Sequence, residues 1–301
     1  MTSAYCKYGF ETTYGSGTTS TWYKLYANNV NTDESYTHVN QEYSIARRVL
    51  PSKFNTTKTI SGSITCALDY ATLQRLMRNI MWGSPVGGYY YFFQISDSTI
   101  NSLVIQIADY TDTANYVTTY SGIIITQLKI AYKIKELSTI EISFIAQSKT
   151  VESSESAPDN FTIDNKSFVD YEQIISYDSS YSEVINSSAL LITINRTVDE
   201  NTHIIGSQTP LKFYDSGYMS IAAELTFSEN EYSIFSKFSD NLVTTFKCGQ
   251  NPDDLSIWPY FIEFVNVSLL TLTHSISAAG KVEKRVTFEG NIGTSIKLSA
   301  L

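Results

Sequence analysis

The sequence predicts a mainly β fold with short helices, built as two tandem domains of one design. Apolar and polar residues alternate along many segments, which is the period of a strand with one buried face. Helical spacing of apolar residues is confined to two short segments. The same order of segments occurs twice along the 301 residues, a length that is sufficient for two domains of ordinary size.

In the first half, a strand is predicted to run directly into a short helix. Residues 57–68 alternate, and Gly62 falls on their apolar face. Apolar residues then recur at helical spacing over residues 73–81, where Asp69 can cap the helix and Gly83 can end it. The apolar face of the predicted strand consists of Ile60, Ile64, Cys66 and Leu68.

Further strands are predicted before the first half ends. Tyr89–Ile95 is rich in aromatic residues, and Leu103, Ile105 and Ile107 share one parity. Two longer segments, separated by residues 133–137, then predict an antiparallel hairpin. The apolar residues that share one parity in each strand are Ile124, Leu128, Ile130 and Tyr132 in the first and Ile140, Ile142 and Phe144 in the second.

The second half returns to this order after a stretch that is rich in Ser and Glu. Strands are predicted over residues 190–194 and 221–227, followed by a short helix that begins at the capping box of Ser228 and Glu231. Residues 260–267 are prone to form a strand. A final hairpin is predicted from Leu270, Leu272 and Ile276 in one strand and Val282, Val286 and Phe288 in the other.

Short alignments support the repeat. The segment Ile140–Ala146 matches Lys284–Gly290 in its apolar pattern, and a Pro-x-Lys-Phe sequence stands before the alternating strand of each half, at Pro51 and at Pro210. We therefore predict a first domain over residues 1–147, a linker or surface excursion over 148–187, and a second domain over 188–301.

The composition favours an assembling protein over a nucleic-acid binder. Hydrophobic residues make up 43% of the chain and charged residues only 17%, so much of its surface must consist of neutral polar side chains. The net charge is −9, whereas proteins that grip nucleic acid carry an excess of basic residues. A smooth conduit that does not retain DNA remains compatible with this charge.

No catalytic, metal or cofactor site is predicted. The three cysteines (Cys6, Cys66 and Cys248) form no CxxC motif and are interpreted as structural thiols. No two of the three histidines have metal-ligand spacing, and the chain has neither a nucleophile elbow nor a phosphate-binding loop. The sequence also predicts no signal peptide and no membrane span.

Two other classes of protein share this composition. A cell-surface or pilus-like β protein is also rich in Ser, Thr, Asn and Tyr, but it would need a secretion signal. A carbohydrate-binding β-sandwich would use aromatic side chains, such as those of the run Tyr89–Phe93, to stack against sugars.

Parts of the chain resemble the tail tube proteins of long-tailed viruses of bacteria and archaea. The segment Ile60–Asp69 with the helix after it is similar to the core of these proteins, and the hairpin segments Gly122–Ile130 and Ile140–Ala146 are similar to their terminal hairpin. The opening segment Tyr8–Gly17 looks like their N-terminal arm. The resemblance covers most of residues 1–147 and, more loosely, residues 188–297.

The resemblance implies a small β-sandwich or half-barrel with one flanking helix per domain, and rings of six domains that stack into a tube. With two domains fused, it implies that three chains form a pseudo-hexameric ring whose strands make one β-barrel around a channel for DNA. It further implies a structural role in the virion tail, assembly in the host cytoplasm, and contacts with tape-measure and tail-end proteins.

On this basis, two groups of residues are expected to act in assembly. The polar residues Thr126, Glu141 and Ser143 are expected to face the channel, although Lys129 lies on the same hairpin. The barrel and the ring interface are expected to involve Ile124, Leu128, Ile130, Ile140, Ile142, Phe144, Leu270, Leu272, Val286 and Phe288.

Overall fold

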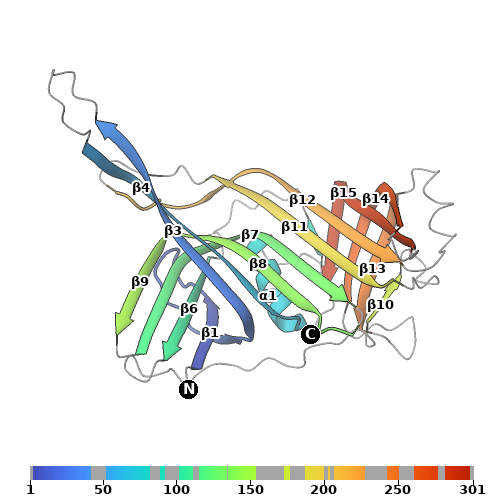
Figure 1. Cartoon of the computed structure of the whole chain (residues 1–301), viewed down its shortest axis with the longest axis horizontal. Coiled ribbons are helices and arrows are strands. Elements are labelled where there is room, and N and C mark those ends of the chain that lie inside the picture. Colours follow the sequence, from blue (N-terminus) through green and yellow to red (C-terminus); the bar gives the residue numbers. More distant parts are fainter. Residues whose placement is uncertain are drawn as a thin grey trace.

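Figure 1 shows the structure of the chain, which is a computed structural model. The structure describes residues 3–41, 52–81, 89–91, 102–110, 115–133, 135–153, 173–176, 187–199, 203, 207–227, 243–250, 261–276 and 282–298. These residues form one connected sheet of 15 strands and a single helix, which confirms the predicted mainly β class.

The elements follow the chain in the order that Figure 1 labels. Those before residue 147 are β1 (Ser3–Phe10), β2 (Tyr23–Leu25), β3 (Ala27–Gln41), β4 (Ser52–Ala67), α1 (Tyr70–Ile80), β5 (Tyr89–Tyr91), β6 (Leu103–Tyr110), β7 (Asn115–Lys133) and β8 (Thr139–Ala146). Those after it are β9 (Ser148–Ser153), β10 (Gln173–Ser176), β11 (Ala189–Asp199), β12 (Tyr214–Phe227), β13 (Val243–Gln250), β14 (Phe261–Ile276) and β15 (Val282–Leu298).

The long strand β7 belongs to two parts of the sheet. Its residues 115–123 lie between β6 and β9, and β6 continues the sheet through β1 to β2. Its residues 124–133 lie between β8 and β11. Two irregularities mark the change: Gly122 has a φ of 63°, and the register against β8 shifts between Ile125 and Gln127. Such bulges bend a strand, which lets one strand serve both parts.

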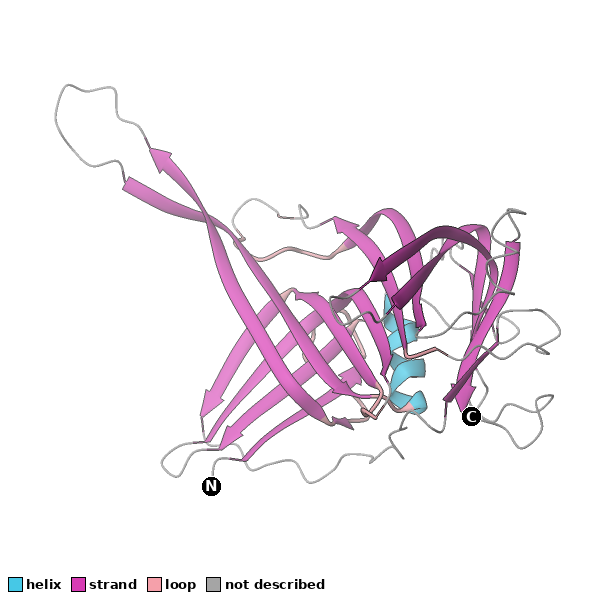
Figure 2. Ribbon diagram, turned by 45° about the vertical axis from the view of Figure 1, so that its right-hand side comes forward, coloured by secondary structure: helices cyan, strands magenta, loops and turns pink. Residues whose placement is uncertain are grey.

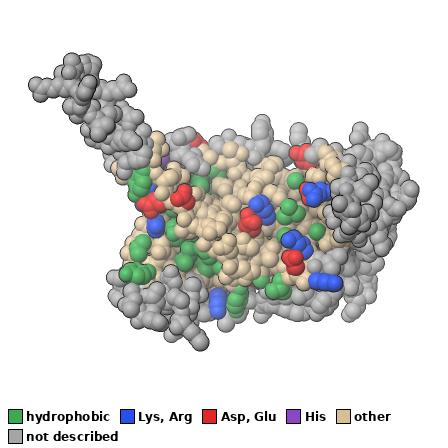
Figure 3. All heavy atoms as spheres, viewed as in Figure 1, with side chains coloured by type: hydrophobic (Ala, Val, Ile, Leu, Met, Phe, Trp, Pro, Cys, Tyr) green, Lys and Arg blue, Asp and Glu red, His purple; other side chains and the backbone are tan. Residues whose placement is uncertain are grey.

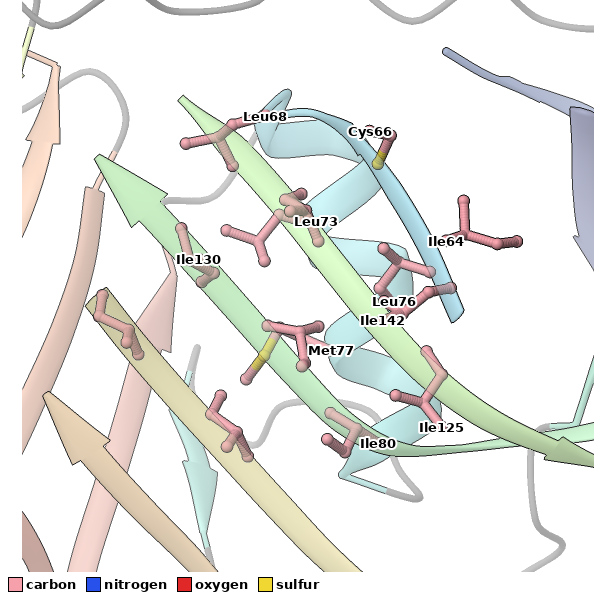
Figure 4. Packing of buried hydrophobic residues seen from close by; sticks show 14 of the residues in the cluster. Ile64, Cys66, Leu68, Leu73, Leu76, Met77, Ile80, Ile125, Ile130 and Ile142 are labelled. Carbon is pink, nitrogen blue, oxygen red and sulfur yellow. The ribbon is translucent and has the colours of Figure 1, made fainter. Parts of the chain in front are cut away.

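Helix α1 packs against the sheet through one apolar face, as its periodicity predicts. Asp69 caps it by accepting hydrogen bonds from the backbone N–H groups of Ala71 at 3.0 Å and Thr72 at 3.2 Å. The helix ends at Ile80, and Gly83 lies outside the described residues. Figure 4 shows its residues Leu73, Leu76, Met77 and Ile80 against strand residues that include Ile64, Cys66, Ile130 and Ile142.

The predicted alternation of β4 is confirmed. Ile60, Ile64 and Cys66 are buried in the main core, and Gly62 lies on the same face, opposite Phe144 of β8. A Cβ atom on Gly62 would lie 2.5 Å from Cζ of Phe144. The glycine therefore gives the aromatic ring the room that a side chain would take.

The second half contains the predicted strands. In β11 and β12, Leu190, Ile192, Ile194, Ile221, Ala223 and Leu225 are buried, and β14 and β15 form the predicted antiparallel hairpin. The helix predicted after the Ser228–Glu231 capping box lies outside the described residues. The first residues of the stretch interpreted as a linker, Ser148–Ser153, form β9 and pair with β7.

The hairpin of β3 and β4 extends beyond the rest of the sheet. β4 pairs with β8 over Ile60–Ala67, whereas β3 is the only described strand that pairs with its residues 52–59. The N–H of Lys58 also donates to the carbonyl of Gln208 at 2.8 Å. Figures 1 and 2 show this hairpin projecting away from the body of the molecule. In this part of β4, residues 56–59 are exposed or only partly buried, so the arm adds little to the core.

Candidate assembly surface

Two sets of four strands lie side by side in the sheet with the same internal order. The N-terminal unit is β3-β4-β8-β7 and the C-terminal unit is β11-β12-β15-β14. In register, Gly62 of β4 stands opposite Phe144 of β8, and Ala223 of β12 stands opposite Phe288 of β15. The strands of one unit therefore correspond one to one with those of the other.

The two units meet where β7 pairs with β11. The pairing is antiparallel and runs from Gln127 opposite Asn195 to Lys133 opposite Ala189. We call this contact the internal junction. On the core side of the sheet it is apolar and closed, because the facing pairs are all buried: Leu128 with Ile194, Ile130 with Ile192, and Tyr132 with Leu190.

The other side of the internal junction is polar. The Gln127 side chain donates from Nε2 to Oδ1 of Asn195 at 2.7 Å, and Asn195 donates from Nδ2 to Oγ of Ser220 at 3.3 Å. These bonds cross from β7 to β11 and on to β12. The junction therefore combines backbone pairing, an apolar face and a side-chain hydrogen-bond chain.

At the far end of each unit, the corresponding strand edge has no partner among the described residues. Among the described strands β3 pairs only with β4, and most of the side chains over residues 27–37 are exposed. β14 pairs with β15 along one side, but on the other side β13 reaches only as far as Ser268. We call β3 and residues 269–276 of β14 the outer edges. In the order of the two units, β3 corresponds to β11 and β14 corresponds to β7, and β7 and β11 are the strands that meet in the internal junction.

The three residues expected to face a channel lie in β7 and β8. Glu141 and Ser143 alternate with the buried Ile140, Ile142 and Phe144, so they are on the face turned away from the main core, below called the open face. Thr126 lies at the β7 bulge and donates from Oγ1 to the carbonyl of Ser143 at 3.2 Å. Whether the open face lines a channel stays a prediction.

Two cations of the open face are held by carboxylates. Lys129 Nζ lies 2.9 Å from Oε1 of Glu141, and Arg285 Nε lies 3.0 Å from Oε1 of Glu224. Figure 3 looks onto this face and shows acidic and basic side chains next to one another among polar and backbone atoms. The positive charge of Lys129, which lies on the same hairpin as the residues expected to face a channel, is thus balanced by the adjacent carboxylate.

The prediction that Ile124 shares a face with Leu128 is wrong. Ile125 joins the main core instead, and Ile124 packs on the opposite face with Ile145 and Phe213. The cause is the bulge between Ile125 and Gln127, because one extra residue in a strand reverses the alternation of every residue before it.

Most other residues expected at a ring interface are buried within the chain itself. Their apolar side chains pack in the main core, so the hairpins present polar residues and backbone edges, rather than these apolar groups, to the outside. They are Leu128, Ile130, Ile140, Ile142, Phe144, Val286 and Phe288; for Leu270 and Leu272 the structure describes only the strand β14 that contains them. Their part in a ring interface stays a prediction.

Asn79 fixes the bend of β7, and sequence reasoning did not identify it. Its fully buried side chain donates from Nδ2 to the carbonyl of Ile123 at 3.3 Å and accepts at Oδ1 from the N–H of Ile125 at 2.8 Å. A helix side chain thus bonds the backbone on both sides of Ile124, where the register of β7 is irregular. A polar residue on the buried face of an amphipathic helix was the available signal.

Glu11 holds the same bend from the N-terminal arm. Its carboxylate accepts hydrogen bonds from the backbone N–H groups of Gly15 and Gly17, each at 2.8 Å, and of Gly122 at 3.1 Å. The hydroxyl of Ser102 also donates to it. The segment Tyr14–Gly17 is therefore a turn closed around one carboxylate.

Within the described residues, no group of three His, Cys, Asp or Glu side chains could hold a metal ion. Cys6 and Cys66 are buried free thiols. Burial, together with the nearby charge of Asp69, raises the pKa of Cys66 to about 12, so this thiol stays protonated near neutral pH. None of the helices in the described part of the chain has the length and apolar character needed to cross a membrane.

The chain was compared with models of protein families. A family model described as "Phage tail tube protein" matches residues 3–290, which is nearly the whole chain and includes both four-strand units except for residues 291–298 of β15. No curated protein matches the chain.

Proposed function

Since the chain belongs to the phage tail tube protein family and is therefore a structural protein of the virion tail, we propose that three copies close into a ring and that such rings stack into a tube for DNA. Each chain would contribute two four-strand units, so the ring would be pseudo-hexameric. The observation that carries this proposal is that the two strands of the internal junction, β7 and β11, each have a counterpart at an outer edge. The counterpart of β7 is β14, and the counterpart of β11 is β3.

The outer edges support closure into a ring. The internal junction joins the last strand of one unit to the first strand of the next, which is a head-to-tail contact. Head-to-tail contacts that repeat by a fixed rotation generate a closed ring when the rotation closes. If three chains repeat the internal junction between them, every outer edge finds a partner, and the sheets become one barrel without exposed edges.

The open face is suited to line the channel. The cations Lys129 and Arg285 are paired with Glu141 and Glu224, so these two positive charges are less available to bind phosphate. The net charge of −9 also repels DNA. We infer that Thr126, Glu141 and Ser143 face the channel and that DNA contacts it only transiently and without sequence preference.

The β3–β4 hairpin supports stacking. Strands in a closed barrel run at a tilt to the barrel axis, so a hairpin that continues past the sheet protrudes from one end of the ring. Residues 52–59 and their partners in β3 are such a continuation. We infer that it reaches the next ring, while tape-measure and tail-end proteins bind the tube and the protein assembles in the host cytoplasm.

Native mass spectrometry and negative-stain microscopy of the purified chain would test the ring. We expect a smallest closed assembly of three chains of 33.8 kDa each, seen as rings about 100 Å wide, since six units of about 25–30 Å surround the channel. Rings of six chains, or a chain that stays monomeric at all concentrations even when assembled tube is added as seed, would contradict the proposal.

A further inference from the structure

We propose that residues Val30–Ser35 of β3 in one chain pair antiparallel with Thr271–Ile276 of β14 in the neighbouring chain, with Asp33 opposite Thr273. This inference rests on the proposed ring and adds to it the residues and the register of the contact between chains. It follows from the internal junction, which is a copy of that contact within the chain.

The first step places β3 on β11. Asp33 stands opposite Ser61, which directly precedes Gly62 in β4. Thr193 stands opposite Ala222, which directly precedes Ala223 in β12. Because Gly62 and Ala223 occupy the same register position in the two units, Asp33 of β3 corresponds to Thr193 of β11.

The second step places β14 on β7. Lys129 of β7 stands opposite Glu141, and Thr273 of β14 stands opposite Arg285. Glu141 comes three residues before Phe144, as Arg285 comes three residues before Phe288, so Lys129 corresponds to Thr273. In the internal junction Thr193 pairs with Lys129, which puts Asp33 opposite Thr273 when the same contact forms between chains.

The side chains at this register are available and compatible. Asp33, Ser35, Thr271 and Thr273 are all exposed in the single chain. The pairing brings no two like charges opposite each other, because residues 271–276 of β14 include no Asp or Glu to face Asp33 and Glu34. On the face that carries these four residues, the small polar side chains leave room for the backbones to form a ladder.

The core side of the proposed contact differs from the internal junction. Val30, Thr32 and Glu34 are the counterparts of the buried Leu190, Ile192 and Ile194. The contact between chains is therefore less apolar than the contact within the chain. A polar outer strand resists unwanted pairing while the chain is still free, because exposed apolar edges favour aggregation.

Covering β3 would not isolate the charge of Glu34. Its carboxylate lies 2.8 Å from Nζ of Lys58 and 3.5 Å from Nζ of Lys149, and it accepts a hydrogen bond from the Tyr36 hydroxyl at 2.6 Å. A carboxylate with two cations and a hydroxyl around it can be covered at far lower cost than an unpaired one.

Disulfide trapping tests the register. We would mix chains carrying Asp33→Cys with chains carrying Thr273→Cys under assembly conditions, oxidise them, and separate the products on a non-reducing gel. Directly opposite residues of two strands are within the Cα distance that a disulfide spans. We expect a covalent dimer from the mixture, and covalent trimers as the largest product when both substitutions are in one chain.

The matched control moves one cysteine along the same strand. Asn29→Cys is exposed and lies on the same side of β3, but it is four residues from Asp33, which is about 13 Å at the rise of a strand. Mixed with Thr273→Cys, it should give at most a few per cent of the cross-linked product. The parent chain controls for Cys248, whereas Cys6 and Cys66 are buried.

The outcomes separate the inference from the proposed function. Two results would overturn the register and leave the proposed ring intact, provided that rings assemble normally. One is that the Asn29→Cys control cross-links as well as Asp33→Cys does. The other is that Asp33→Cys and Thr273→Cys give no cross-link at all. A covalent ladder that continues past three chains would support the register and reject the closed trimer. A failure to assemble in microscopy, with no cross-link, would reject both.

Discussion

At the scale of single residues, the bend of β7 depends on polar groups that reach it from elsewhere in the chain. Asn79 bonds Ile123 and Ile125 from helix α1, and Glu11 bonds Gly122 from the N-terminal arm. Gly122 has a left-handed φ of 63°, and a Cβ atom there would lie 2.6 Å from Cβ of Gln147. Glycine is therefore required at this bend.

Replacing Asn79 with alanine should destabilise the chain by about 1–3 kcal/mol, because a backbone N–H and a carbonyl would lose their partner inside the core. Denaturant unfolding of the unassembled chain would measure this free energy. Arg78→Ala is the comparison on the same helix: Arg78 is exposed, and its replacement should cost no more than about 1 kcal/mol, because it removes only a cation–π contact with the Phe10 ring, 5.1 Å from the guanidinium carbon. Equal effects of both substitutions would show that the Asn79 contacts contribute nothing.

The carboxylate of Glu34 gives the base of the long hairpin a pH dependence. Hydrogen bonds from Lys58 and from the Tyr36 hydroxyl lower its pKa from 4.5 to about 2. A carboxyl group whose pKa is lower in the folded state stabilises the fold above its unfolded pKa, and this contribution disappears as the pH falls toward the folded pKa.

We therefore expect Glu34→Gln to cost up to about 1 kcal/mol at pH 7, as is usual for a pair that is largely accessible to solvent. The difference from the parent chain should shrink between about pH 4.5 and pH 2, where the parent carboxylate is itself protonated. Unfolding free energies measured at several pH values would check this. A difference that is constant from pH 7 to pH 2 would mean that the ion pairs do not stabilise the chain.

At the scale of elements, the projecting end of the β3–β4 hairpin can be removed while the rest of the sheet is kept. Thr37 of β3 stands opposite Thr57 of β4, so an Asn-Gly turn can join them in place of residues 38–56. The pairing of β4 with β8 over Ile60–Ala67 would be kept. We expect this shortened chain to form rings but few or no tubes, as counted by electron microscopy.

Ring formation by the shortened chain is the control for this deletion. Native mass spectrometry of the shortened chain should still give the assembly of three chains, because both outer edges over Val30–Ser35 and Thr271–Ile276 are retained. Tubes of normal length from the shortened chain would show that the hairpin is not needed for stacking.

Helix α1 and the face of β4 were predictable because their signals are local. The Asp69 cap, the helical spacing up to Ile80 and the alternation of Ile60, Ile64 and Cys66 lie within a few residues of one another. The face of Ile124 was not predictable. The bulge that reverses it is bonded by Asn79, which is distant in sequence, and alternation alone carries no sign of an extra residue.

At the scale of the whole molecule, the described residues form a single sheet, in which an internal junction joins two equivalent units and each unit has an outer edge on its far side. Several side chains also link the two halves: Gln147 donates to the carbonyls of Pro210 and Leu211, and Arg196 donates to the carbonyl of Ile80 at the end of α1. These links fix one unit relative to the other, which a repeating rotation around a ring requires.

The sequence by itself determined that this protein is mainly β, that its strands have one apolar face, that a capped helix follows β4, and that no recognisable catalytic motif is present. These properties depend on residue types and on spacing along the chain. Only the tertiary structure decided that β7 pairs with β11, which edges remain open, and which carboxylates balance Lys129 and Arg285. The neighbours of a strand are set by contacts between residues far apart in sequence. An alternating pattern determines which face of a strand is buried, but it does not determine which strand lies beside it.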